Sequence, residues 1–180
     1  MGGISGGHIP PVAHDKAMVF IDGTNVLLTA RDHNLLIPNF YALGQRAVAP
    51  RQLIRVYVYS IEEQINTAKA LHGSACFEKC RVVLGDSIQT PKGGVREKGV
   101  DALLVADLVF HAAMKNFDYG VVISKDSDFA VALKRVEDFG CRTGLVSLAD
   151  RPPQRLIDAC DDFQFWDASQ LQRQGLAKHA

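Results

Sequence analysis

Four aspartates stand where short apolar segments end or begin. Asp22 closes an apolar run that starts at Ala17, and Asp101 opens a strongly apolar stretch. Asp126 and Asp128 follow a third apolar run within four residues of its end at Ser124. Carboxylates in one cleft repel one another unless a cation lies between them, and Mg²⁺ prefers oxygen ligands. Since a bound cation can polarise a phosphodiester and activate water, the four acids are candidates for metal-assisted phosphodiester hydrolysis.

Each of these acids also has a structural interpretation. Asp22 and Asp126 could be N-caps, whose side chains accept a hydrogen bond from the first turn of a helix. Asp101 and Asp128 could be first-turn acids that the helix dipole favours. Both interpretations stay open for each residue taken alone. A position of all four acids at the same edge of the fold would favour a shared metal site.

The segments that must position these acids alternate between short apolar runs and longer helical stretches. Strands are predicted over residues 17–22, 53–60, 81–84, 119–124, 142–147 and 163–166. Helices are predicted over 25–48, with an interruption near Pro38, and over 62–79, 100–115, 127–139 and 153–160. This alternation is typical of an α/β fold with a mainly parallel sheet and helices on both faces.

The direction of the strands brings the acids to one place. Ligands of an open parallel sheet bind outside the carboxyl ends of its strands. Asp22 lies at such an end, Asp126 and Asp128 follow another, and the helix that begins near Asp101 starts from the same edge. The sequence therefore predicts one cleft that contains all four carboxylates.

Residues 85–99, directly before Asp101, are predicted to be an irregular loop because glycine, proline and charged residues interrupt them. Loops of about 12–15 residues are usually functional or mobile, so this one is expected to close over phosphates. The candidate phosphate contacts are Arg96, Lys98 and Lys125, and also Arg31 and Lys92, for which ordinary surface charge is an equally good explanation.

The composition limits the class of protein. The 180 residues are 47% hydrophobic, which suits one well-packed domain, and the net charge of zero means that a polyanion must be met by a local basic patch. No apolar run is long enough to cross a membrane. We expect a flexible leader over 1–16, a domain over 17–168 and a polar tail over 169–180. The four cysteines lack the spacing of a zinc site and are expected to be reduced thiols of a cytoplasmic protein.

Three motifs occur in order along the chain: Phe20-Ile-Asp-Gly-Thr-Asn25, Lys98-Gly-Val-Asp101 with Asp107 downstream, and Ile123-Ser-Lys-Asp-Ser-Asp-Phe129. Together they resemble the NYN domain, a family of PIN-like nucleases, from about Met18 to Trp166. The resemblance implies a three-layer α/β/α sandwich and a ribonuclease that depends on Mg²⁺ or Mn²⁺ and takes RNA as its substrate.

The resemblance also implies roles for single residues. Asp22, Asp101, Asp126 and Asp128 match the metal-binding acids of the family. The residues that match supporting positions are Asn25, Ser124, Ser127 and Asp107. Asp107 lies about 9 Å along its helix from Asp101 at 1.5 Å per residue, so it is expected to be structural. Lys125 departs from the family, which usually has glycine there.

Two other functions compete with this one. A nucleic-acid-binding or regulatory module of the same fold with weak catalysis stays open, because a fold does not determine its function. Ile21-Asp-Gly-Thr24 also resembles the first motif of haloacid dehalogenase phosphatases. That motif needs a second acid at the position of Phe20, so this chemistry is excluded. A homodimer is possible, although no sequence feature indicates one.

Overall fold

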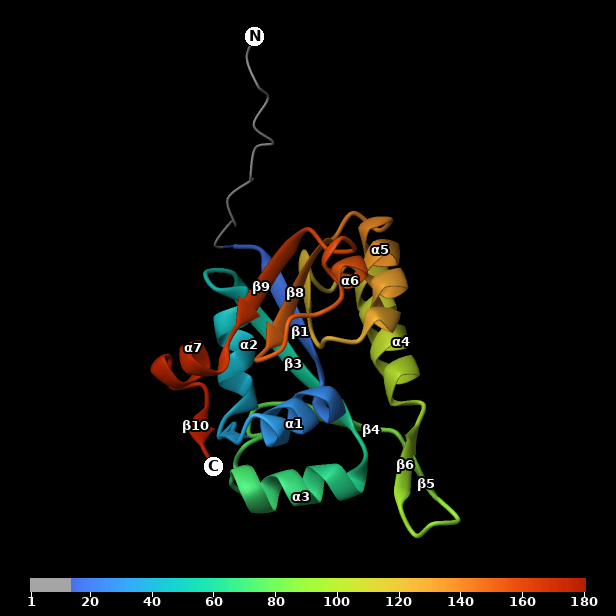
Figure 1. The fold of residues 1–180 in the computed structure, drawn as a ribbon. Coiled ribbons are helices and arrows are strands. Elements are labelled where there is room, and N and C mark those ends of the chain that lie inside the picture. The colour runs from blue at the N-terminus through green and yellow to red at the C-terminus, as the bar shows by residue number, and fades with distance from the viewer. Residues whose placement is uncertain (1–13) are drawn as a thin grey trace.

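The computed structural model describes residues 14–180, and its centre is a six-stranded sheet in which all neighbouring strands are parallel (Figure 1). In chain order these strands are β1 (Lys16–Asp22), β3 (Gln52–Ser60), β4 (Arg81–Leu84), β7 (Tyr119–Ile123), β8 (Arg142–Leu148) and β9 (Asp162–Trp166). Most of the predicted leader over 1–16 lies outside the described residues, and Lys16 already belongs to β1.

The strand order across the sheet is β4-β3-β1-β7-β8-β9. The chain starts in the middle, builds outward to β4, and then returns to the other side of β1 to form β7. The ends of β1 and β7 are neighbours, with Ile21 opposite Ile123. Connections leave these two strands toward opposite sides, and a crevice at such a reversal is where open α/β sheets bind ligands. The topology therefore brings Asp22 beside the residues that follow Ile123.

Helices cover both faces of the sheet, and the strand side chains alternate between two cores. On β1, Val19 and Ile21 belong to one core, and Met18 and Phe20 belong to the other. Helices over the first face are α1 (Gly23–Asp32), α2 (Phe40–Val48), α3 (Glu62–His72) and α7 (Ala168–Arg173). Over the second face lie α4 (Val100–Ala113), the 3₁₀ turn η1 (Ser127–Phe129), α5 (Ala130–Glu137) and α6 (Gln154–Ile157). The predicted three-layer sandwich is confirmed, and burial on both faces explains why the central strands are apolar throughout.

The segment predicted as an irregular loop, 85–99, is instead an antiparallel hairpin. Its strands are β5 (Asp86–Gln89) and β6 (Val95–Lys98), and it projects from the edge of the sheet at which α1 begins (Figure 1). Thr90 and Gly94 exchange backbone and side-chain hydrogen bonds across its turn, and Gly93 adopts a φ of +77°. The loop prediction failed because both strands are short and exposed, so they lack the apolar alternation that identifies a half-buried strand.

The predicted polar tail, 169–180, packs onto the domain. Asp167 and Gln170 form a capping box that starts α7, and Leu171 on that helix is fully buried. The last strand, β10 (Lys178–His179), pairs with β2 (Leu35–Leu36) in antiparallel orientation. The tail is polar on average, but its apolar residues Leu171, Leu176 and Ala177 are all buried and attach it to the domain.

Several helix boundaries differ from the prediction. The helix predicted over 62–79 ends at His72, because Gly73 has a φ of +109°, which no helix accommodates. Cys76 and Cys80 therefore lie in the turns that follow and do not share a helical face, and all four cysteines are free thiols. The helix predicted over 127–139 begins with the η1 turn and ends at Glu137. Within residues 14–180, no helix has the length and apolarity to cross a membrane.

The packing of the tail gives a prediction about stability. Leu171→Ala removes a fully buried side chain and should lower the free energy of unfolding by about 2–5 kcal/mol, the usual cost of such a cavity. Urea denaturation measures this change. The exposed neighbour Gln172 is the matched control, and Gln172→Ala should leave the stability nearly unchanged. Equal stability of the two variants would show that α7 contributes nothing to the domain.

Candidate active site

The buried carboxylate of Asp22 connects the two strands at the centre of the fold. Asp22 is the last residue of β1, and only 4% of it is exposed. Its Oδ1 accepts a hydrogen bond from the backbone N–H of Asn25 at 3.1 Å, and its Oδ2 accepts one from the Ser124 hydroxyl at 2.8 Å. Asp22 is therefore the N-cap of α1, as one interpretation of the sequence proposed, and it also ties that helix to the end of β7.

The surroundings of Asp22 disfavour its negative charge. Burial raises the pKa of the Asp22 carboxyl from 3.8 to about 7, and the hydrogen bonds from Asn25 and Ser124 oppose this increase. The negative charges of Asp101 and Glu97 add to it. A carboxylate that burial and like charges both destabilise is stabilised when a cation binds beside it.

Glu97, which no sequence motif indicated, belongs to this acidic group. It lies on β6, and its Oε2 accepts a hydrogen bond from the Thr24 hydroxyl at 2.6 Å. The same Thr24 hydroxyl contacts the Ser60 hydroxyl at 3.1 Å, at the end of β3. The hairpin is thereby attached to the start of α1, two residues from Asp22. Because side chains alternate along a strand, recognising β6 would have placed Glu97 on the opposite face from Arg96 and Lys98.

Asp101 is the second residue of α4 and lies in its first turn, two residues after the N-cap Gly99. Partial burial raises the pKa of the Asp101 carboxyl, and the negative charges of Asp126, Glu97 and Asp128 raise it further. The same side chain raises the pKa of Asp22. Asp101 is therefore within electrostatic reach of every other acid in the group.

Asp126 and Asp128 follow β7 and hold the next turn in place. The Asp126 side chain accepts a hydrogen bond from the backbone N–H of Asp128 at 2.9 Å, which makes Asp126 the N-cap of η1. The backbone N–H of Asp126 donates to the Ser124 hydroxyl at 3.0 Å. Ser124, which is buried, thus joins Asp22 to the Asp126 backbone. The capping interpretation holds for both N-caps, and it leaves their remaining oxygen capacity open to a cation.

The five acids interact electrostatically, but they do not form a complete metal-binding site. Across the described part of the chain, residues 14–180, no three His, Cys, Asp or Glu side chains are already placed to hold one ion. The donors are all oxygens, which suits Mg²⁺ or Mn²⁺, and Mg²⁺ usually keeps several waters beside one or two carboxylates. The excess of negative charge and the buried position of Asp22 fit such an ion.

The other supporting residues, besides Ser124, also make structural contacts. The Asn25 side-chain oxygen accepts from the backbone N–H of Lys125 at 3.3 Å, so Asn25 links α1 to the loop after β7. Asp107 accepts a hydrogen bond from the Tyr59 hydroxyl at 2.9 Å, farther along α4 from Asp101. Ser127 is the first residue of η1, and its carbonyl accepts the N–H of Ala130.

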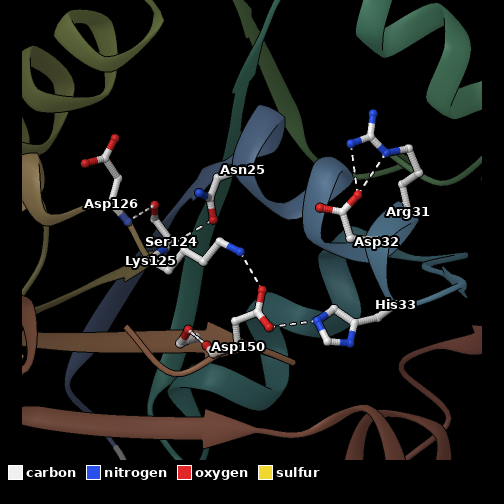
Figure 2. A network of polar contacts seen from close by, with 9 residues as sticks. Asn25, Arg31, Asp32, His33, Ser124, Lys125, Asp126 and Asp150 are labelled. Atoms are coloured by element: carbon white, nitrogen blue, oxygen red, sulfur yellow. Dashed lines mark hydrogen bonds and ion pairs between the residues drawn. The ribbon is translucent and has the colours of Figure 1, made fainter. Parts of the chain in front are cut away.

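The basic residues predicted to contact phosphate differ in their surroundings. Lys125 points away from Asp126, and its ammonium pairs with Asp150 at 2.5 Å (Figure 2). Arg31 pairs with Asp32 at the surface at 2.9 Å. Lys92 and Lys98 are exposed on the hairpin. Arg96 lines a hollow of about 420 Å³ to which Glu97 and Asp101 also contribute.

The buried Asp22 leads to a prediction about stability and pH. In the folded protein its pKa is raised from 3.8 to about 7, so between these values the folded state keeps a proton that the unfolded state loses. Stability in the absence of metal should therefore fall as pH rises through this window. Asp22→Asn removes the effect, and its stability relative to wild type should increase by up to roughly 3 kcal/mol between pH 5 and 8, at 1.36 kcal/mol per pKa unit.

Urea denaturation in EDTA across this pH range measures the difference. Asp138→Asn is the matched control, because Asp138 is exposed and forms a surface pair with Arg135 at 2.8 Å. A stability difference for Asp22→Asn that does not change with pH would mean that burial does not destabilise this carboxylate.

Comparison with known proteins gives a family and a fold. The model of the NYN domain matches residues 16–170. A protein of unknown function from Vibrio parahaemolyticus, known from its crystal structure, is 20% identical, with a TM-score of 0.67 over 89% of this chain and 98% of that chain. At that identity the likeness concerns the fold alone. A putative oxidoreductase from Parabacteroides merdae is 13% identical, with a TM-score of 0.35 over 86% of this chain and 31% of that chain, too low to support an argument.

No curated protein matches the sequence. The match to the family model covers most of the chain, and the range it matches includes the three sequence motifs that contain these acids. The chain belongs to the NYN domain family, whose members are generally nuclease-like.

Proposed function

We propose that this protein is an endoribonuclease that cleaves RNA phosphodiester bonds with the help of Mg²⁺ or Mn²⁺. The observation that carries the proposal is the position of Asp22: buried at the strand reversal, hydrogen-bonded to Ser124 of the neighbouring strand connection, and surrounded by further acids. Perturbed carboxyl groups in the ligand-binding crevice of an α/β sheet are candidates for a functional site.

The residues that would hold the cation are Asp22, Asp101, Asp126 and Asp128, with Glu97 beside them. When bound, the cation would polarise the phosphodiester, lower the pKa of an attacking water and stabilise the leaving oxygen. Ser124 orients the Asp22 carboxylate by donating a hydrogen bond to it. Thr24 does the same for Glu97, so both carboxylates keep a defined direction before any substrate arrives.

The hairpin supplies the candidate contacts for the RNA backbone. The chain has no net charge, so attraction for RNA must be local. Within the described residues, neither Arg96 nor Lys98 forms an ion pair with another side chain, and both are exposed. Arg96 also lines the hollow that contains Glu97 and Asp101. A guanidinium there could hold a phosphate beside the acids.

The acid cluster predicts that single neutral substitutions abolish the chemistry. Asp22→Asn and Asp126→Asn should each reduce cleavage of a labelled RNA in Mn²⁺ by roughly 10²-fold or more, the usual scale for losing one group that stabilises charge in the transition state. EDTA should stop cleavage by the wild-type protein, and added Mn²⁺ should restore it.

Asp138→Asn is again the matched control and should cleave at the wild-type rate. Wild-type cleavage by Asp22→Asn or Asp126→Asn would remove that acid from the proposed site. If the wild-type protein binds RNA and does not cleave it with either metal, the alternative of a nucleic-acid-binding module with weak catalysis is favoured.

The hairpin predicts a change in salt dependence. Arg96→Ala and Lys98→Ala should weaken RNA binding and flatten the decrease in affinity with salt, because each lost phosphate contact reduces the slope by about 0.7 for a single strand. Fluorescence anisotropy across a salt series measures this slope. Lys134→Ala, which changes an exposed lysine on α5, is the control. An unchanged slope in the Arg96→Ala, Lys98→Ala double variant would place the RNA path elsewhere.

A further inference from the structure

Lys125 presents a problem for an acid site that must bind a cation. It lies between Ser124, which holds Asp22, and Asp126. Its backbone N–H donates to the Asn25 side chain, so the position of its backbone is defined. Its side chain is a long flexible stem that ends in an ammonium group. An ammonium this close to several carboxylates is attracted to them, and there it would occupy the place of the metal.

The structure keeps that ammonium elsewhere. The Lys125 Nζ lies 2.5 Å from Oδ2 of Asp150, and Figure 2 shows the side chain extending away from Asp126 toward this partner. Asp150 comes from the turn after β8, on the far side of β7 from β1. Lysine and aspartate side chains are both about one-third exposed, at 33% and 38%. The pair therefore lies at the surface, where an ion pair contributes little to stability.

Other contacts hold Asp150 in the position that receives the lysine. Its second oxygen, Oδ1, contacts Nε2 of His33 at 2.7 Å, at the end of α1. Its backbone carbonyl accepts a hydrogen bond from the Ser147 hydroxyl at 2.5 Å. The hydrogen bond from Lys125 lowers the pKa of the Asp150 carboxyl, with His33 contributing in the same direction. Both carboxylate oxygens are thus engaged, by one residue from α1 and one from the loop after β7.

We propose that Asp150 is a positioning residue that holds the Lys125 ammonium outside the acid cluster, so that the cluster stays free to bind its divalent cation. The inference rests on the proposed metal-dependent function. Asp150 acts through Lys125 and touches none of the acids that would hold the ion. Its contribution is to give the lysine a carboxylate partner that competes with Asp22, Asp101 and Asp126.

The test is a double-variant cycle with metal affinity as the readout. Mn²⁺ binding is measured by isothermal titration for the wild-type protein, Asp150→Asn, Lys125→Met and the double variant. Asp150→Asn should weaken Mn²⁺ binding by up to roughly fivefold, the scale of an ion pair at the surface. In the double variant, where no ammonium remains to compete, affinity should return to that of Lys125→Met.

A purely structural role of Asp150 predicts a different pattern, because a distorted turn would not be repaired by also removing Lys125. Asp150→Glu, which keeps the carboxylate, should bind Mn²⁺ like the wild type. Asp32→Asn is the matched control, since Asp32 pairs with Arg31 at the surface in a similar way, and it should leave Mn²⁺ affinity unchanged. Thermal melting checks that every variant is folded, and Asp150→Ser replaces Asp150→Asn if the latter is not.

Two results would overturn the inference and leave the proposed function standing. One is wild-type Mn²⁺ affinity in Asp150→Asn. The other is an affinity in the double variant as low as that in Asp150→Asn. If the wild-type protein itself binds no Mn²⁺ and cleaves no RNA, the proposed function fails and the inference fails with it.

Discussion

The Asp22 carboxylate, buried between the ends of β1 and β7, is the contact on which the arrangement of the site depends. One oxygen accepts a hydrogen bond from the backbone N–H of Asn25 and so caps α1. The other accepts a hydrogen bond from the Ser124 hydroxyl, whose oxygen accepts one from the backbone N–H of Asp126. A single side chain thereby relates a helix, a strand end and a 3₁₀ turn. Burying a charge is unfavourable unless it is paired. Burial of the Asp22 charge therefore destabilises the metal-free protein, and a bound cation would remove this destabilisation.

Asp22 and Asp126 combine an observed structural role with the proposed role in metal binding. Asp22 and Asp126 are N-caps, and a capping carboxylate uses only part of its acceptor capacity. The capping interpretation and the metal interpretation are therefore compatible at these positions. The backbone N–H groups that donate hydrogen bonds to these capping carboxylates also orient them, and the Ser124 hydroxyl does the same for Asp22.

Two segments outside the central sheet influence the charge around Asp22. The β5–β6 hairpin brings Glu97 to the Thr24 hydroxyl beside Asp22, and it exposes Arg96 and Lys98 to solvent. On the other side, Asp150 holds the Lys125 ammonium away from the acids. One segment thus adds negative charge to the centre, and the other keeps positive charge out of it.

The sequence by itself determined the α/β class, the parallel sheet and the position of the acids at strand ends. Strands buried on both faces must be apolar over their whole length, and the direction of a parallel strand decides at which edge its last residue lies. Asp22 at the end of β1 and Asp126 after β7 follow from these rules alone. Only the tertiary structure decided the hairpin, the packed tail with Leu171, and the partners of Glu97 and Lys125. The hairpin is too short and exposed to show a periodic apolar pattern, and the packed tail and the partners of Glu97 and Lys125 depend on contacts between residues far apart in the chain.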